Sequence, residues 1–242
     1  MALFAVACVG VWADTAIAAP GDTTRVSVSS GGAEGNDFSD TPSISADGRY
    51  VAFRSFATNL VAGDTNDSWD VFVHDRQSGA TDRVSVSSGG AEGNSFSDTP
   101  FISADGRYVA FRSPASNLIA VDTNGAFDVF VRDRQSGVTE RISVSSGGAE
   151  GNRDSNLPSI SADGRYVAFR SSASNLVAGD TNGTADVFVH DRQSGVTERV
   201  SVSSSGAQGN DASWNPSISA DGRYVALFSL ASNLVASDTN GC

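Results

Sequence analysis

The stretch Ile160–Arg170, with the sequence ISADGRYVAFR, decides the fold of this chain. In it, Asp163-Gly164 separates two short segments that read as strands. Alternating, β-rich segments between turn residues indicate half-buried strands, and Asp-Gly supplies the positive φ that a tight hairpin turn needs. The stretch therefore predicts an antiparallel β-hairpin.

The hairpin returns at a fixed interval of 58 residues, with copies that begin at Ile44, Ile102 and Ile218. A second motif, RVSVSS or RISVSS, keeps the same interval and is headed by Arg25, Arg83, Arg141 and Arg199. A fixed period of this length predicts one supersecondary unit per repeat. We place the repeats at about 42–88, 100–146, 158–204 and 216–242, the last of them incomplete, with residues 23–30 as an orphan fourth strand.

Each repeat contains four segments that read as strands. In the third copy they are Pro158–Ala162, Arg165–Ser171, Asp186–Asp191 and Thr197–Ser203. Tight turns join the first pair and the second pair, whereas the other two connections are long, and no amphipathic helical segment appears. Tandem units of four antiparallel strands predict an all-β chain folded as a β-propeller of about four blades. A β-sandwich is the alternative, but it gives no reason for strict repetition.

The motifs ISADGRYVAF, DVFVxD and TxRVSVSS together resemble the WD-like propeller repeat of the TolB type. The resemblance covers residues 23–242, although these repeats are longer than the usual blade of that family, mainly in the two long loops. It implies an exported bacterial protein that is secreted, periplasmic or on the cell surface. It also implies a binding platform, a scaffold or an accessory domain of a hydrolase, because propellers of this type serve all three purposes.

Charge excludes several classes of partner and of chemistry. The chain has a formal net charge of −12, and all its 16 basic residues other than His are Arg. Nucleic acids and anionic membranes are therefore not expected as partners, because binding to them needs clustered positive charge. Without Lys, neither Schiff-base catalysis nor a P-loop is available.

The N-terminus allows two interpretations. Residues 1–18 contain an apolar run followed by Ala16-Ile17-Ala18, which predicts an export signal, and the run is too short for a transmembrane helix. Residues 19–242 would then be the propeller domain. Alternatively, the N-terminal residues supply the missing strand of the fourth blade, and a disulfide between Cys8 and Cys242 closes a four-bladed ring. The chain could also be a fragment of a longer propeller.

A repeated Asp-Thr-Asn loop is the candidate metal site, because Ca²⁺ prefers carboxylate, amide and carbonyl oxygens. Its side chains recur in all four copies: Asp64, Asn66 and Asp70; Asp122, Asn124 and Asp128; Asp180, Asn182 and Asp186; and Asp238 with Asn240. The alternative is structural, since Asn-Gly favours a turn and Asp forms Asx-turns without any ion. Both interpretations stay open at this point.

The candidate partner surface lies where the copies differ. ADGR and DRQSG do not change between copies, whereas the long loops do, and both long loops leave a four-stranded blade on the same face. That face is expected to carry Phe38, Trp69, Phe96, Phe127, Arg153 and Trp214. Aromatic residues and Arg are common at recognition surfaces. The alternative is that these aromatic residues only pack between blades.

No catalytic constellation is present. There is no G-x-S-x-G motif, and His74 and His190 share one repeat position that Arg132 occupies in the middle copy, so we expect exposed strand residues there. The sequence therefore predicts a non-catalytic binding or scaffolding module for a protein or glycan ligand. A hydrolase accessory domain and a self-assembling surface protein are the alternatives.

Overall fold

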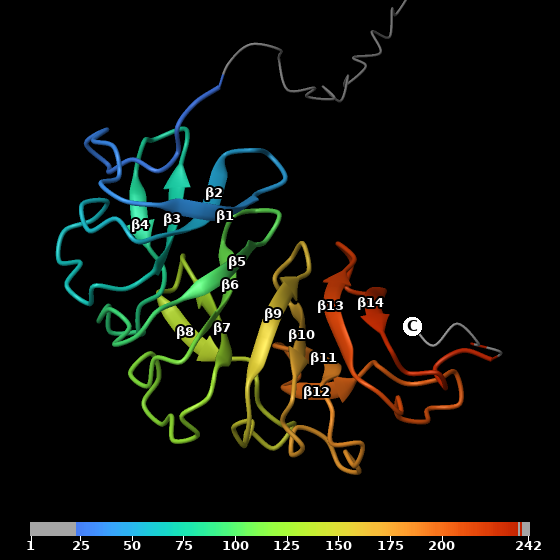
Figure 1. Ribbon diagram of the computed structural model, residues 1–242. Coiled ribbons are helices and arrows are strands. Elements are labelled where there is room, and N and C mark those ends of the chain that lie inside the picture. The colour runs from blue at the N-terminus through green and yellow to red at the C-terminus, as the bar shows by residue number, and fades with distance from the viewer. Residues whose placement is uncertain (1–22, 237, 239–242) are drawn as a thin grey trace, which may run out of the picture.

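A computed structural model describes residues 23–236 and 238, and these residues form an all-β structure (Figure 1). The first blade contains β1 (Ser39–Ile44), β2 (Tyr50–Ser55), β3 (Asp70–Asp75) and β4 (Thr81–Arg83). The second contains β5 (Asp98–Ile102), β6 (Tyr108–Ser113), β7 (Asp128–Asp133) and β8 (Val138–Arg141). The third contains β9 (Ser155–Ile160), β10 (Tyr166–Ser171), β11 (Asp186–Asp191) and β12 (Val196–Arg199). The fourth contains β13 (Ser213–Ile218) and β14 (Val225–Ser229).

Each complete blade is one antiparallel sheet whose strands pair in chain order. The Gly of each Asp-Gly turn has a φ between 71° and 73°, for example 72° at Gly106 and at Gly164. The Asp-Gly turn therefore closes the first hairpin of each blade as predicted. The first strands β1, β5, β9 and β13 lie against one another in succession, so they are the inner strands. Figure 1 shows the four blades following one another along an open arc, with the first and fourth blades at its two ends. The prediction of propeller blades is confirmed.

The core lies between the blades, because the sheets of the second and third blades bury both of their faces. One face of the first blade presents small side chains, including Ala52, Val71 and Val73, which pack against Phe111 and Phe130 of the second blade. The second and third blades repeat this contact with the equivalent residues. Small residues on one sheet therefore leave room for the aromatic rings of the next, which allows dense packing.

Residues 23–30 form no strand. Val28 makes only an isolated bridge with Glu34, and its carbonyl oxygen accepts a hydrogen bond from Thr81 Oγ1 at 2.5 Å. The second blade has the same contact, in which Val86 accepts from Thr139 Oγ1 at 2.6 Å. The segment therefore covers the first blade in the way that the loop after β4 covers the second. Residues 23–30 thus form a loop where a strand was predicted. The complete blades show the same arrangement, since their fourth strands end at the Arg that begins RVSVSS or RISVSS.

Several predictions lie outside the described residues: the export signal at 1–18, the disulfide between Cys8 and Cys242, and Asn240. Among residues 23–236 and 238 there is no helix, so none of them forms a helix long and apolar enough to cross a membrane.

Candidate functional site

The predicted calcium loop holds its carboxylates around an arginine. Arg83, the last residue of β4, directs Nη1 toward Asp64 at 3.4 Å, Asp70 at 3.1 Å and Glu92 at 2.7 Å. Single oxygen atoms of these three acids lie within 4.8 Å of one another. Asp70 is fully buried, and Ser85 Oγ donates to its Oδ1 at 2.5 Å. The sequence interpretation missed Arg83 and Glu92, although the Arg recurs in all four copies of RVSVSS or RISVSS and the Glu in three copies of GGAEGN.

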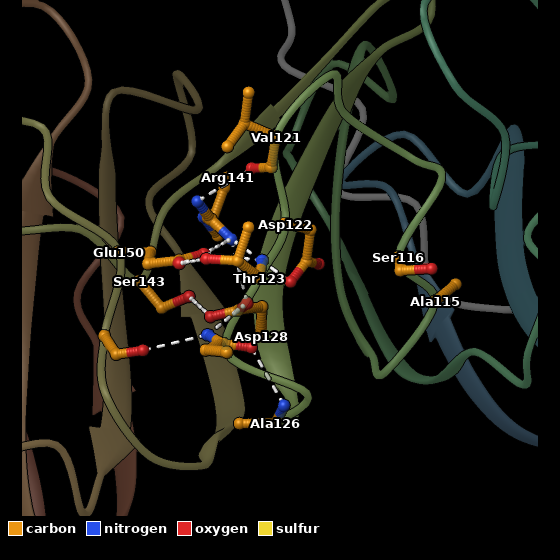
Figure 2. Close-up of polar contacts among 12 residues, drawn as sticks. Ala115, Ser116, Val121, Asp122, Thr123, Ala126, Asp128, Arg141, Ser143 and Glu150 are labelled. Atoms are coloured by element: carbon orange, nitrogen blue, oxygen red, sulfur yellow. Dashed lines mark hydrogen bonds and ion pairs between the residues drawn. The ribbon is translucent and has the colours of Figure 1, made fainter.

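The second blade repeats this cluster (Figure 2). Arg141 Nη1 lies 3.2 Å from Asp128, 2.8 Å from Glu150 and 3.6 Å from Asp122, and Ser143 Oγ donates to Asp128. Thr123 Oγ1 donates to Glu150, which connects the loop to the crossing segment between the second and third blades. Three acids therefore face one guanidinium in each of the first two blades.

The third blade differs at one residue of the cluster. Gln208 occupies the position of Glu92 and Glu150, and its Nε2 donates to Asp180 Oδ1 at 2.9 Å and to Asp186 Oδ2 at 3.3 Å. Arg199 Nη1 lies 3.5 Å from Asp180 and 3.6 Å from Asp186. This blade thus places one acid fewer around its Arg.

In the three loops whose Asn is described, the side-chain oxygen of this Asn accepts a hydrogen bond within the turn. Asn66 Oδ1 accepts from the amide of Ser68 at 2.9 Å, and its Nδ2 donates to Asp70 Oδ2 at 3.1 Å and to the carbonyl of Gly93 at 2.9 Å. Asn124 and Asn182 make the same contacts. Of the predicted ligands, the structure brings together the two Asp residues of each of the first three loops. Asp238 belongs to the described residues, whereas Asn240 lies outside them.

Burial changes the protonation of these acids. Burial raises the pKa of Asp64 to about 6, and the neighbouring Asp70 charge adds to the effect. Burial likewise raises the pKa of Asp70, Asp122, Asp128 and Asp180. Asp64 Oδ1 and Asp122 Oδ2 are buried and accept no hydrogen bond from the described residues. The clusters of the first two blades therefore have spare capacity for positive charge, either a proton or a cation.

The variable residues gather at a second place, which we call the variable rim. It consists of equivalent positions of the inner strand, the second strand and the loop that follows. Its members are Phe38, Asp40, Arg54, Phe56 and Trp69; Phe96, Asp98, Arg112, Pro114 and Phe127; Asp154, Asn156, Arg170, Ser172 and Ala185; and Ala212, Trp214, Phe228 and Leu230. Of the predicted partner residues, Phe38, Trp69, Phe96, Phe127 and Trp214 occupy these positions, whereas Arg153 is exposed beside them.

Arginines connect the rim from blade to blade. Arg54 pairs with Asp40 through two hydrogen bonds of 2.5 and 3.0 Å and lies 3.4 Å from Asp98 of the next blade. Arg112 pairs with Asp98 at 2.5 and 2.9 Å and donates to Asn156 Oδ1 at 2.7 Å. An alternating row of acidic or amide groups and guanidinium groups therefore crosses the inner strands of three blades.

Aromatic rings cover this row. The Arg54 guanidinium lies 4.4 Å from the centre of the Trp69 ring, and Arg112 lies 4.9 Å from that of Phe127. In the fourth blade Trp214 stacks on Phe228 with ring centres 5.6 Å apart, so an aromatic pair replaces the Asp-Arg pair. The second-strand Arg residues were missed from the sequence, and the change from Arg to Phe228 in the fourth copy was the available signal.

Arg170 lacks both the aromatic ring and the acidic partner that Arg54 and Arg112 have. Ala185 stands where Trp69 and Phe127 lie, and the side-chain oxygen of Asn156 already accepts from Arg112. Arg170 Nε is buried and makes no hydrogen bond to any residue in 23–236 or 238. Burial lowers the pKa of this guanidinium, and the nearby Asp154 charge opposes the effect.

The backbone is strained at the rim in every blade. A bulge interrupts the inner strand after the rim residue, and Thr41, Thr99, Leu157 and Asn215 adopt a φ of 48° to 52° there. Three of these residues carry branched side chains, and all precede Pro, so this conformation is costly. Bulges redirect side chains and are frequent beside functional sites.

The two His residues are buried, so the expectation of exposed positions was wrong. His74 is 7% exposed and His190 6%, and each Nδ1 lies within 2.9 Å of a Thr hydroxyl, Thr81 or Thr197. Burial lowers the pKa of both. The loop from the preceding repeat covers this position, which the pattern of a single repeat cannot show.

No family model and no curated protein matches the chain. Solved structures do resemble it. TolB from Acinetobacter baumannii has a TM-score of 0.48 and 20% identity, with 79% of this chain and 37% of that chain covered. A putative TolB from Agrobacterium tumefaciens has a TM-score of 0.39 and 16% identity, with coverages of 81% and 72%. The propeller domain of the Trilobed protease from Pyrococcus furiosus has a TM-score of 0.41 and 13% identity, with coverages of 67% and 42%. The chain thus spans less than half of the first and third of these proteins.

Proposed function

We propose that this propeller is a non-catalytic binding module that binds its partner at the variable rim. The framework of the blades is repeated almost unchanged, whereas the rim differs in every blade and combines aromatic rings with arginines. The observation that carries the proposal is Arg170, a half-buried guanidinium with a buried, unpartnered Nε at the centre of the varying residues. A buried donor without a partner is costly unless a ligand supplies the acceptor.

The partner we infer is a protein segment that presents a carboxylate beside an apolar side chain. A carboxylate suits the fork of a guanidinium, and aromatic side chains of the rim provide the apolar contact. Phe38, which is 78% exposed, extends this surface at the first blade. A hollow on the hairpin side of the blades is a weaker candidate for the binding site. Arg107 and Arg134, which line it, already donate to Asp133 and to the carbonyl of Gly106.

A displayed peptide library tests the proposal. We expect enriched peptides with an acidic residue next to an apolar one, and at least tenfold weaker binding to Arg170→Met. Joint replacement of Trp69 and Trp214 by Ala should also abolish binding without unfolding the chain. Arg76→Met on the hairpin side is the matched control and should bind normally. If enriched peptides bind Arg170→Met as tightly as the wild type, the proposal fails; selective binding to an acidic oligosaccharide array would replace the protein partner with a glycan.

We also propose that Ca²⁺ stabilises the loops of the first two blades. Three acids face a single guanidinium there, which leaves two negative charges in a buried place, and hard oxygen ligands of this kind suit Ca²⁺. The third blade, with Gln208, has one ligand fewer. Arg83 and Arg141 are the competitors of the ion, because their guanidinium groups already lie among the carboxylates.

A location outside the cytoplasm is part of the proposal. The TolB-type repeats and the apolar N-terminal sequence support export. Localisation of an epitope-tagged chain by cell fractionation tests it, and retention with the cytoplasmic marker would contradict it.

A further inference from the structure

The third blade carries a carboxamide where the first two blades carry a carboxylate. Gln208 lies in the crossing segment between the third and fourth blades, at the position of Glu92 and Glu150. In each of these three blades the Thr of the Asp-Thr-Asn loop donates its hydroxyl proton to this side chain: Thr65 to Glu92, Thr123 to Glu150 and Thr181 to Gln208. Of the three pairs, only the third combines a hydroxyl with a carboxamide.

The polar groups around this carboxamide fix its orientation. Oε1 of Gln208 accepts from the backbone amide and from the hydroxyl of Thr181, both at 3.2 Å. Nε2 donates to Asp180 Oδ1 at 2.9 Å and to Asp186 Oδ2 at 3.3 Å. The opposite orientation would place the NH2 group against two donors and the oxygen against two carboxyl groups. The carbonyl group therefore faces Thr181, and the nitrogen faces the two acids.

The surroundings of Gln208 provide what attack on an amide carbon requires. Oε1 is bonded to the carbon Cδ, so the Thr181 hydroxyl oxygen 3.2 Å from Oε1 lies beside the atom that it would attack. The backbone amide of Thr181 also donates to Oε1 and stabilises the negative charge that develops there during the attack. Burial raises the pKa of Asp180, and the neighbouring Asp186 charge adds to the effect, so this carboxyl group holds a proton more readily. A protonated Asp180 can deliver its proton to the departing nitrogen.

We propose that Thr181 and Gln208 form an ester crosslink in the folded chain. Oγ1 of Thr181 attacks Cδ of Gln208, the Oγ1–Cδ bond forms, the Cδ–Nε2 bond breaks, and ammonia leaves. The hydroxyl proton passes to water, to which Thr181 is exposed. Asp180 supplies the proton that the departing nitrogen gains, and it then recovers a proton from water. Nothing is oxidised or reduced, and no further reactant is consumed.

The equivalent pairs of the first two blades remain hydrogen bonds. Arg83 lies 2.7 Å from Glu92 and Arg141 lies 2.8 Å from Glu150, and these ion pairs keep both side chains ionised. A carboxylate resists attack by a hydroxyl because its negative charge repels the nucleophile, and it has no amine to release. The crosslink is therefore specific to the third blade.

The ester bond stabilises a blade that lacks an ion pair. It closes a covalent loop around β11 and β12, whose residues lie between Thr181 and Gln208. A covalent loop of this kind stabilises a fold mainly by restricting the unfolded chain. Arg199 Nη1 stays 3.5 Å from Asp180 and makes no hydrogen bond to the described residues, because Gln208 offers it no charge. The third blade thus exchanges the electrostatic contact of the first two blades for a covalent one.

Tryptic digestion of the denatured chain tests the crosslink directly. Cleavage after Arg170, Arg192, Arg199 and Arg223 separates residues 171–192, which contain Thr181, from residues 200–223, which contain Gln208. We expect one product that joins these two peptides, with a mass about 17 Da below their sum because one ammonia is lost. Tandem mass spectrometry should place the bond at Thr181 and Gln208. Two separate peptides of unchanged mass, after prolonged incubation of the folded chain at neutral pH, overturn the proposal.

Matched variants distinguish the ester from other losses of ammonia. A succinimide at Asn182-Gly183 also releases ammonia, but it leaves the two peptides unjoined. Thr181→Val and Gln208→Glu should abolish the joined product, and the second of them recreates the pair of the first two blades. Thr181→Ser keeps a hydroxyl and should retain the product. A joined product that persists in Thr181→Val overturns the assignment.

Two further measurements report on the chemistry of the bond. Mild alkali in water enriched in the heavy oxygen isotope should separate the joined peptides and leave the label in the carboxylate at position 208. Asp180→Asn removes the proton donor and should slow formation of the joined product at least about tenfold. A label found on the Thr181 peptide instead would contradict attack at Cδ. These readouts do not depend on calcium or on peptide binding at the rim.

Discussion

Gly106 lies so close to Tyr50 that a Cβ atom at this position would be 2.1 Å from Cδ2 of the ring, and the same contact recurs between Gly164 and Tyr108. The glycine of the Asp-Gly turn therefore has two tasks. It adopts a positive φ, and it leaves space for the ring of the preceding blade. The turn motif is thus also the contact that joins blades.

Gly106→Ala separates these two tasks when it is compared with Gly79→Ala. Both glycines have a positive φ, 72° and 76°, but an added Cβ at Gly79 meets nothing within 4 Å. Gly79→Ala should lower the free energy of unfolding by about 1 kcal/mol, the cost of the left-handed conformation. Gly106→Ala should cost about 3 kcal/mol or more, because the ring must also move. Urea denaturation measures both, and equal losses would contradict the proposed clash.

Glu92→Gln should destabilise the chain at neutral pH. Burial opposes ionisation of Glu92, but hydrogen bonds from Thr65 and the Arg83 guanidinium 2.7 Å away hold its pKa below its usual value of 4.5. A lowered folded pKa contributes stability above pH 4.5 that is lost as the pH falls, and Gln lacks this contribution. We expect a loss of about 1 kcal/mol at pH 7 and less at pH 4 by urea denaturation. Glu34→Gln, at the exposed equivalent position, should change nothing; an equal loss there would refute the explanation.

Arg83→Gln should make the first blade depend on Ca²⁺. Removing one partner of a buried ion pair costs about 3 to 5 kcal/mol, because the acids are left with uncompensated charge. Calcium at millimolar concentration should restore part of this loss in the variant. It should raise the melting temperature of the variant more than that of the wild type, because Arg83 competes with the ion only in the wild type. The additional substitution Asp64→Asn should reduce the recovery. A melting temperature that is the same with calcium and with chelator in both proteins would exclude the calcium proposal.

Arg107→Gln should make the chain more sensitive to acid. Arg107 pairs with Asp133 through hydrogen bonds of 2.9 and 2.7 Å and holds the pKa of that carboxyl well below its usual value. A lowered folded pKa contributes stability above the unfolded value of 3.8 that is lost as the pH falls. The midpoint of acid unfolding, followed by circular dichroism, should therefore move to higher pH. Arg153→Gln, at an exposed loop position, is the control and should leave the midpoint in place.

The sequence predicted the strands and the hairpins because they depend on neighbouring residues. Alternation in YVAFR and DVFV, Asp-Gly at a turn and a strict period are local signals, and the structure confirms the propeller blades that they predict. The main local error is the fourth strand, which ends at Arg83, Arg141 and Arg199 instead of continuing through VSVSS; the first strand of the third copy also begins earlier than predicted, at Ser155 instead of Pro158. Ser85 explains the main error, since its hydroxyl donates to Asp70 and accepts from the amide of Val71, so a side chain takes the place of regular strand pairing there.

The candidate sites were predicted only in part, because their residues lie far apart in the chain and meet only in the folded blades. The loop acids were visible in the sequence, but the guanidinium among them comes from Arg83, which lies 19 positions after Asp64 in the numbering. The rim aromatic residues were visible as variable positions, but the row from Arg54 through Asp98 to Arg112 exists only when blades lie side by side. His74 was misjudged for the same reason, because the preceding segment buries it.

The sequence by itself determined the repeat, the four strands of each complete blade, the turns between them and the positions that vary, since each depends on residues close together in the chain. Only the tertiary structure decided which charges meet and which side chains are buried. The physical reason is that every repeat has nearly the same sequence, whereas its environment depends on whether another blade lies in front of it or behind it.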